Sequence, residues 1–196
     1  MTDIDLFAVD SADLARLRAR LVNAADSVQL LDLAYRIVDT PIGPLLLAAT
    51  EAGLVRVAFQ CEDFDAVLED LATAISPRIL RAPTRLDEIA TELDEYFASR
   101  RRVFDVPLDL RLSSGFRQTV QRFLPHIKYG QTASYKEVAA SVGNPNAVRA
   151  VGTACATNPL PIVVPCHRVL RADGSLGGYL GGTAAKAALL ELERAA

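Results

Sequence analysis

A cysteine and a histidine stand side by side in the stretch "VVPCHRVL", as Cys166 and His167. A thiol is a weak nucleophile at neutral pH until a base takes its proton, and an adjacent imidazole can do so directly or through water. The chain has only two histidines and three cysteines. Because neighbouring side chains on a strand point to opposite faces, the dipeptide alone leaves two interpretations open: a buried core thiol or an activated nucleophile.

The residues around Cys166 favour the activated nucleophile. The apolar run "LPIVV" ends at Pro165, so we expect the backbone to turn there and to present the thiol from an apolar wall. Residues 174–182, "GSLGGYLGG", follow it. Such a glycine-rich loop can approach a ligand with its backbone while its tyrosine walls a pocket. A plain flexible hairpin is the alternative for this loop.

Two helices joined by a short turn are predicted upstream of the cysteine. "TASYKEVAASVG" places Ser134 three residues before Glu137, the spacing of a capping box, and ends at Gly143. Asn144 is expected to cap the next helix and Pro145 to take its first position. A helix, a three-residue glycine turn and a second helix outline a helix-turn-helix, a pattern that helical pairs in many enzymes share.

The second of these helices carries small side chains around one long cation, Arg149. A helix that reads the major groove normally carries several long polar side chains. A small-residue helix can instead press its backbone against DNA and leave the arginine a single task. A tightly packed buried helix with one surface arginine is the alternative interpretation.

The elements before this region suggest a separate α/β domain. Residues 1–34 place Leu14, Leu17, Leu21 and Val22 at helical spacing, which predicts a helical extension packed on the main body. Residues 35–111 then show two β-type runs joined at "TEAG", two helices in "DFDAVLEDLATAI" and "LDEIATELDEYFASR", and a further strand in "RRVFDVPLDL". The sequence therefore predicts a small sheet with helices, followed by a mainly helical domain from residue 112.

Composition and charge restrict the function classes. Residues 1–100 carry 9 basic against 18 acidic side chains, whereas residues 101–196 carry 12 against 6, so the basic half hints at a polyanionic partner. No apolar stretch is long enough for a membrane helix, and the N-terminus does not read as a secretory signal. Three cysteines without a CxxC pair argue against a disulfide framework and a zinc site. We expect a cytoplasmic protein that uses no metal.

The run "NPLPIVVPCHRVL", followed by "GSLGGYLGG", resembles the active-site signature of the O6-alkylguanine-DNA alkyltransferases, also called methylated-DNA–protein-cysteine S-methyltransferases. "YGQTASYKEVAASVGNPNAVRAVG" is similar to the helix-turn-helix of that family, and "TPIGPLLLAATEAGLVRVAF" to the start of its N-terminal domain. The resemblance covers about residues 35–196 and leaves residues 1–34 unexplained. It implies an RNase H-like N-terminal domain and a winged-helix-like C-terminal domain.

The resemblance also implies roles for single residues in a repair protein that flips out the damaged base, takes its alkyl group and reacts only once. Cys166 would be the acceptor of the alkyl group, and His167 the base that removes its proton through a water. Glu193 would orient the histidine, Tyr135 would donate a proton or a hydrogen bond to the departing guanine, and Asn158 would brace the turn around the cysteine. No cofactor is implied.

Two further sets of residues follow from the resemblance. Those expected at the minor groove of double-stranded DNA are Arg149, which fills the gap left by the flipped base, with Ala147, Val148, Ala150, Gly152 and Arg168. Those expected to line the guanine pocket are Pro165, Val169, Gly178, Tyr179 and Leu180. Leu180 stands where relatives often have serine or alanine, which leaves the range of alkyl groups open. The protein is expected to be a monomer in solution, with clustering on DNA.

Three alternatives remain at this point. A relative that binds alkylated guanine without repairing it would have tryptophan in place of Cys166. A cysteine hydrolase using Cys166, His167 and Glu193 would turn over repeatedly, although the cysteine and histidine of such enzymes usually lie far apart in sequence. A helix-turn-helix regulator would need several base-reading side chains, which "NAVRAVGTACA" lacks.

Overall fold

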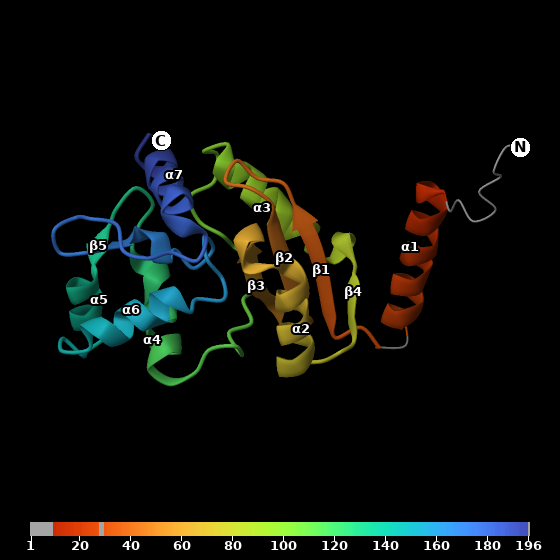
Figure 1. Ribbon diagram of the computed structural model, residues 1–196, viewed down its shortest axis with the longest axis horizontal. Helices are drawn as coiled ribbons and strands as arrows, with labels where there is room; N and C mark the ends of the chain where they lie inside the picture. The colour runs from red at the N-terminus through yellow and green to blue at the C-terminus, as the bar shows by residue number, and fades with distance from the viewer. Residues whose placement is uncertain (1–9, 28–29, 196) are drawn as a thin grey trace, which may run out of the picture.

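The computed structural model describes residues 10–27 and 30–195 (Figure 1). Its N-terminal part is built on a four-stranded sheet of order β3-β2-β1-β4, formed by β1 (Leu33–Val38), β2 (Leu45–Thr50), β3 (Gly53–Phe59) and β4 (Ile79–Arg81). The first three strands pair antiparallel, and β4 pairs parallel with β1. The predicted pair of adjacent strands joined at "TEAG" is thereby confirmed as β2 and β3.

Alternation along the strands explains why helices cover both faces of the sheet. Leu46 and Ala48 of β2 pack with α2 (Phe64–Ala74), whereas Leu45 and Leu47 point to the opposite face, where α3 (Asp87–Phe97) packs. In Figure 1, α2 lies in front of the sheet and α3 behind it. Both predicted helices are confirmed, and short 3-10 turns precede them at Gln60–Glu62 and Pro83–Leu86.

The strand predicted in "RRVFDVPLDL" is wrong. The described residues there form no named strand, and only a bridge between Leu54 and Leu108 joins them to the edge of the sheet. Pro107 interrupts the run, and its carbonyl accepts a hydrogen bond from the Leu54 amide at 2.8 Å. A proline has no amide hydrogen to continue a ladder, which explains the single bridge.

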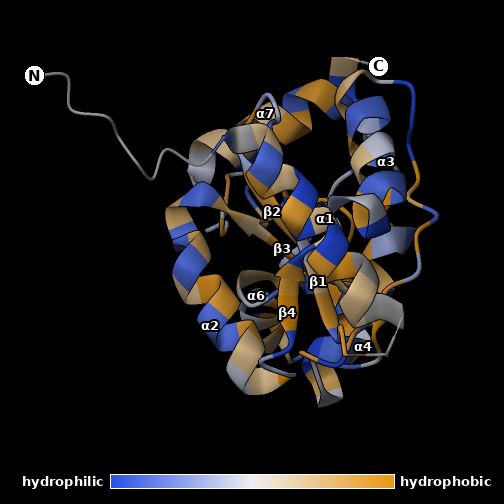
Figure 2. Ribbon diagram, turned by 90° about the vertical axis from the view of Figure 1, so that its right-hand side faces the viewer, coloured by the Kyte–Doolittle hydropathy of each residue, from blue (hydrophilic) through white to orange (hydrophobic). Residues whose placement is uncertain are grey.

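The extension forms one helix, α1 (Ser11–Ser27), at the far end of the sheet from the C-terminal part (Figure 1). Figure 2 views the molecule from the side of this helix. The expectation that its leucines pack on the main body is wrong, because Leu14, Leu17 and Leu21 are 39–55% exposed. Val22, the fourth residue of the predicted stripe, does pack against the core, and it lines a pocket together with residues 81–84 at the end of β4. Helical spacing identifies an apolar stripe without identifying its partner.

The C-terminal part consists mainly of helices around a short parallel ladder. They are α4 (Gly115–Phe123), α5 (Tyr135–Ser141), α6 (Val148–Ala156) and α7 (Gly182–Ala195), with 3-10 turns at Leu124–His126 (η3) and Cys166–Arg168 (η4). Strand β5 (Ala133–Ser134) pairs with β6 (Val169–Leu170). This ladder brings the start of α5 beside the residues that follow Cys166.

The predicted helix pair is present as α5 and α6, with one correction to its turn. The capping box of Ser134 and Glu137 is formed, and Gly143 adopts a φ of +77° after α5, as its role as a stop predicts. Asn144 and Pro145 do not start the second helix, since α6 begins at Val148. The Asn144 carbonyl instead accepts a hydrogen bond from the Ala147 amide at 2.9 Å, so these residues extend the turn.

Candidate active site

Asn158 fixes the turn that carries Cys166. Its side-chain nitrogen donates to the Val164 carbonyl at 2.7 Å and contacts the Cys166 Sγ at 3.2 Å, while its side-chain oxygen accepts from the Leu160 amide at 3.1 Å. All three contacts are buried. Because an amide offers donors and an acceptor together, one side chain holds both ends of the loop and touches the sulfur. The thiol is thus placed by a neighbour eight residues away.

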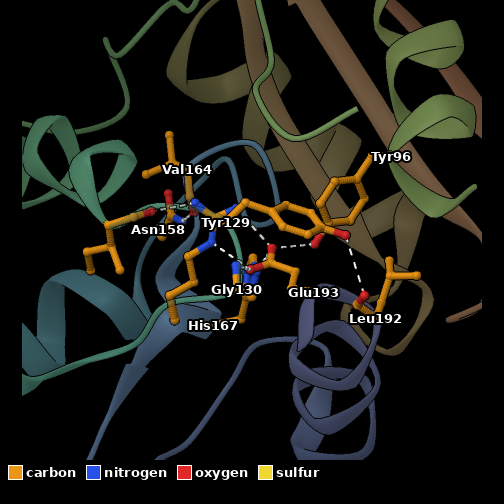
Figure 3. Close-up of polar contacts among 10 residues, drawn as sticks. Tyr96, Tyr129, Gly130, Asn158, Val164, His167, Leu192 and Glu193 are labelled. Atoms are coloured by element: carbon orange, nitrogen blue, oxygen red, sulfur yellow. Dashed lines mark hydrogen bonds and ion pairs between the residues drawn. The ribbon is translucent and has the colours of Figure 1, made fainter. Parts of the chain in front are cut away.

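One ring nitrogen of His167 is bound by Glu193. The His167 Nε2 and Glu193 Oε1 atoms lie 2.8 Å apart, and both side chains are buried (Figure 3). An ionised carboxylate only accepts, so we assign the imidazole proton to Nε2. Burial lowers the pKa of His167, although the bond to Glu193 opposes this. The Nδ1 atom is buried and has no partner among the described protein atoms, which makes it a free basic site.

Glu193 accepts hydrogen bonds from five donors. Its Oε1 atom accepts from His167 Nε2, from Arg168 Nη2 at 2.9 Å and from the Tyr96 hydroxyl at 2.7 Å. Its Oε2 atom accepts from Arg168 Nε at 2.9 Å and from the Gly130 amide at 3.2 Å. Burial alone would raise the pKa of Glu193, but bonds from His167 and Arg168 outweigh it and bring the pKa to about 2. The carboxylate is therefore ionised at every physiological pH.

Arg168 lies in this network and not at a DNA surface. The side chain is buried, pairs with Glu193, and donates from Nη1 to the Ile127 carbonyl at 2.6 Å. The expectation that Arg168 contacts DNA is therefore wrong. The physical reason is that a buried carboxylate needs a buried counter-charge, and Arg168 supplies it to Glu193.

The thiol is enclosed and protonated at rest. Cys166 is 2% exposed, and burial raises its pKa to about 11 against the opposing effects of Asn158 and Lys186. Lys186 is a buried cation near the site that was not predicted from the sequence. It stands seven residues before Glu193 on α7, hence on the same helical face, and its Nζ donates to the Val169 carbonyl at 2.7 Å. A lone lysine in the apolar run "AAKAALL" was the available signal.

The backbone of the glycine-rich loop, residues 174–182, comes close to the Tyr135 side chain at Gly177. A Cβ atom added to Gly177 would lie 2.3 Å from the Tyr135 hydroxyl oxygen, whereas one added to Gly178 would meet nothing within 4 Å. The backbone thus comes close to the Tyr135 hydroxyl at Gly177, which the sequence did not single out, while Gly178, predicted to line the pocket, is the exposed residue next to it. Tyr135, the first residue of α5, is partly buried, and burial raises its pKa, so its hydroxyl keeps the proton and can donate.

The other predicted pocket residues lie beside the Cys-His-Arg turn or in the glycine-rich loop that follows it. Pro165 and Val169 are buried on either side of the Cys-His-Arg turn. The Tyr179 ring lies edge-on to the His167 ring, with centroids 6.4 Å apart, and also contacts Phe59 of β3 at 5.4 Å. Leu180 is partly buried, and its carbonyl accepts from the Cys61 thiol at 3.4 Å. Two residues of the N-terminal part, Phe59 and Cys61, therefore touch the glycine-rich loop that follows the cysteine.

The helix around Arg149 is not fully buried. Val151, Ala154 and Cys155 form the inner side of α6, whereas the outer side exposes its small side chains and one cation. The exposed residues include Val148, Arg149 and Ala150, while Ala147 and Gly152 are partly exposed. The alternative of a tightly buried helix is therefore wrong, and the outer side of α6 is a smooth surface with a single long cation.

Metal clusters and membrane-spanning helices are two features that the described part of the chain lacks. Residues 10–27 and 30–195 contain no group of three or more histidine, cysteine, aspartate or glutamate residues placed to hold a metal ion. They also contain no helix that is long and apolar enough to cross a membrane.

Comparisons with known proteins agree with this geometry. Residues 33–110 match the family described as "6-O-methylguanine DNA methyltransferase, ribonuclease-like domain". Residues 115–195 match "6-O-methylguanine DNA methyltransferase, DNA binding domain". The chain belongs to the O6-methylguanine DNA methyltransferase family. Its activity is that of a methylated-DNA–protein-cysteine methyltransferase in DNA repair, and its ribonuclease-like and helical parts confirm the predicted fold class.

Individual members of the family are similar over most of their length. The methylated-DNA–protein-cysteine methyltransferase of Mycobacterium tuberculosis H37Rv is 43% identical over 160 residues, which are 82% of this chain and 92% of the relative. The constitutive enzyme of Bacillus subtilis is 40% identical, with 82% and 94% covered. Two M. tuberculosis crystal structures, an O6-methylguanine methyltransferase and OGT in complex with DNA, superpose with TM-scores of 0.74 and 0.73 at 40% and 41% identity, each covering 83% of this chain and 93% of the other. Neither family match includes α1.

Proposed function

We propose that Cys166 attacks the alkyl carbon on O6 of a guanine turned out of the DNA duplex, and keeps the alkyl group as a thioether. A sulfur–carbon bond forms, the carbon–O6 bond breaks, and its electron pair stays on the guanine. Because nothing in the site regenerates the thiol, each molecule reacts once. The observation that carries the proposal is a buried set of four side chains, Asn158, Cys166, His167 and Glu193. Among the side-chain nitrogens of this set, the basic Nδ1 of His167 is the one without a hydrogen-bond partner.

The proton of the thiol leaves through His167. Its Nδ1 atom accepts the proton, through a water molecule, and the ionised Glu193 on the opposite nitrogen stabilises the imidazolium that forms. The departing guanine carries a negative charge, which a hydrogen bond from the Tyr135 hydroxyl stabilises. A thiol with a pKa of about 11 is thus deprotonated only where this base acts on it.

The guanine lies against Tyr179 and the backbone around Leu180, between Pro165, Val169 and the glycine loop with Gly178. Support for this placement comes from the Tyr179 ring beside His167 and from the approach of Gly177 to the Tyr135 hydroxyl. Since Cys166 is enclosed, the loop of residues 174–182 moves when the base enters. The side chain of Leu180 then limits the size of the alkyl group.

DNA is bound by the C-terminal part, residues 112–196, through the minor groove and with little sequence preference. The outer side of α6 supports this, because Ala147, Val148, Ala150 and Gly152 let its backbone approach the groove while Arg149 enters the gap left by the flipped base. The surplus of basic side chains in residues 101–196 faces the phosphates. The M. tuberculosis OGT structure with DNA is consistent with this partner.

The proposal also includes the cellular compartment and the oligomeric state in which the protein reacts. The protein acts in the cytoplasm as a monomer in solution that clusters on DNA, and needs no cofactor. Its cysteines Cys61, Cys155 and Cys166 are all free thiols, as a reducing compartment requires.

Mass spectrometry of the protein after mixing with O6-methylguanine duplex tests the proposal. The expected result is a gain of about one methylene group on Cys166, located by peptide mapping, that stops at one equivalent because no step restores the thiol. Repeated turnover would instead support a cysteine hydrolase. A protein that binds the lesion but gains no mass would be a binding-only relative.

Replacing Arg149 by alanine is expected to slow repair of duplex DNA roughly tenfold or more, because flipping costs a few kcal/mol that the wedged side chain partly offsets. Reaction with the free base O6-benzylguanine needs no flipping and should change little. The ratio of the two rate constants is the measurement. Arg122→Ala removes another exposed cation from the same domain, so it controls for the loss of charge alone and should lower the ratio much less than Arg149→Ala. Equal losses on both substrates would refute the flipping role.

A further inference from the structure

The N-terminal part reaches the reactive site through one hydroxyl group. Tyr96 lies on α3, and its hydroxyl donates to Glu193 Oε1 at 2.7 Å, on the carboxylate oxygen that also accepts from His167 (Figure 3). The four other donors to this carboxylate come from His167, Arg168 and Gly130, all in the C-terminal part. Tyr96 is thus the single N-terminal residue among the hydrogen bonds described for Glu193.

Packing holds the Tyr96 side chain in this position. The residue is completely buried, and its ring contacts Phe97 and Phe104 of its own domain with centroids 5.4 Å apart. Across the interface it meets the Tyr129 ring edge-on at 5.9 Å. Burial also raises the pKa of Tyr96 far above its usual range, so the hydroxyl keeps its proton and acts only as a donor to the carboxylate. Neither the ring nor the hydroxyl is free to reorient.

The contact has an electrostatic consequence for the base. The more hydrogen bonds the carboxylate accepts, the less of its negative charge acts on the imidazole, because each donor draws charge toward itself. The Tyr96 hydroxyl shares Oε1 with His167 Nε2, so it competes directly for that charge. Its presence keeps the imidazole weakly basic and hence neutral over a wider range of pH, which is the form that accepts a proton from Cys166.

We propose that Tyr96 is a positioning and tuning residue for alkyl transfer: through Glu193 it sets the basicity of His167, and so makes the ribonuclease-like domain part of the reaction. The inference rests on the proposed role of His167 as the base. It gives this domain, which supplies no group that touches the alkyl carbon, a defined contribution to the chemistry.

The test follows His167 directly by nitrogen NMR as a function of pH. The chain has only two histidines, and the exposed His126, which bonds to the Phe123 carbonyl, serves as an internal reference in every variant. Tyr96→Phe keeps the ring packing and removes only the hydroxyl. The expected result is an upward shift of the His167 titration by about 0.5 to 1 pH unit, since a hydrogen bond to a charged group is strong and only part of its effect passes to the imidazole.

The rate of Cys166 alkylation by O6-benzylguanine, measured across pH, is the second readout. In Tyr96→Phe the acid limb of the profile moves to higher pH by the same amount, so the rate at a pH on that limb falls roughly three- to tenfold. Tyr129→Phe is the matched control, because it removes a neighbouring hydroxyl that bonds to the Leu192 carbonyl and not to Glu193. Neither the titration nor the acid limb should move in this control.

Each failure has a distinct signature. An even loss of rate at all pH values in Tyr96→Phe, with an unmoved His167 titration, would show a purely structural role and overturn the inference. An equal shift in Tyr129→Phe would also overturn it. A wild-type acid limb that does not coincide with the His167 titration would instead overturn the proposed role of His167 as the base. If Tyr96→Phe does not fold, 3-fluorotyrosine at position 96, a stronger donor, should shift both readouts to lower pH.

Discussion

Replacing Glu193 by glutamine is expected to destabilise the fold by about 3 to 5 kcal/mol and to slow alkyl transfer on the order of 100-fold or more. The stability loss arises because Arg168 and the carboxylate form a buried ion pair, and the neutral amide leaves the guanidinium charge uncompensated. The rate loss arises because an amide cannot stabilise the imidazolium that forms on His167. One substitution thus affects both the core and the chemistry.

Chemical denaturation at several pH values measures the first effect. The pKa of Glu193 falls from 4.5 to about 2 on folding, so its charge contributes stability that is fully present above pH 4.5 and is lost as the pH falls to about 2. Glu193→Gln should lack that part of the pH dependence. Glu191→Gln is the matched control on the same helix, because Glu191 pairs with Arg194 at an exposed site, and it should behave as the wild type. A stable Glu193→Gln protein would contradict the ion-pair argument.

Replacing Cys166 by serine is expected to abolish alkyl transfer, with a loss of at least about 10³-fold, while binding to O6-methylguanine duplex stays close to that of the wild type. Oxygen is far less readily deprotonated by an imidazole than sulfur and is the weaker nucleophile toward a saturated carbon. The turn should survive, because a serine hydroxyl can still accept from the Asn158 amide, which contacts the sulfur at 3.2 Å. Chemistry and recognition are thereby separated.

Two assays check this separation. Fluorescence anisotropy with a labelled lesion duplex gives the affinity, and intact-protein mass spectrometry gives the transferred methyl group. Cys61→Ser is the control, since a serine there can keep the contact to the Leu180 carbonyl and leaves the acceptor thiol intact. Methyl transfer to another residue in Cys166→Ser, or a large loss of lesion binding, would contradict the assigned role.

Local signals in the sequence predicted most of the fold. The apolar runs of β2 and β3, the basic residues that end the segment of α3 and the Ser134–Glu137 capping box each depend on residues close in the chain. The predictions that failed concern which other part of the chain a segment packs against or pairs with. The leucine stripe of α1 was predicted correctly as helical and wrongly as buried, and the edge strand at Pro107 was predicted from alternation although proline cannot continue a ladder.

The residues of the candidate active site were also predicted only in part from the sequence. The Cys166–His167 motif and its resemblance to a known signature predicted that Cys166, His167 and Glu193 share one site, and the structure places His167 against Glu193. Arg168 was misjudged, because its buried position depends on a carboxylate 25 residues away. Tyr96 was missed for the same reason, since 97 residues separate it from Glu193 and nothing around it in the sequence marks it as part of a site. Pairing between distant side chains requires the folded structure.

The enclosed, protonated state of Cys166 determines how long an unused molecule keeps its reactivity. Oxidants and small electrophiles react with exposed thiolates, and Cys166 is 2% exposed with a pKa of about 11. For a protein that is consumed by a single reaction, every accidental oxidation would remove one repair event from the cell. On the proposed mechanism the sulfur stays covered until a lesion enters beside His167, and we expect this cover to give a single-use reagent a long storage lifetime.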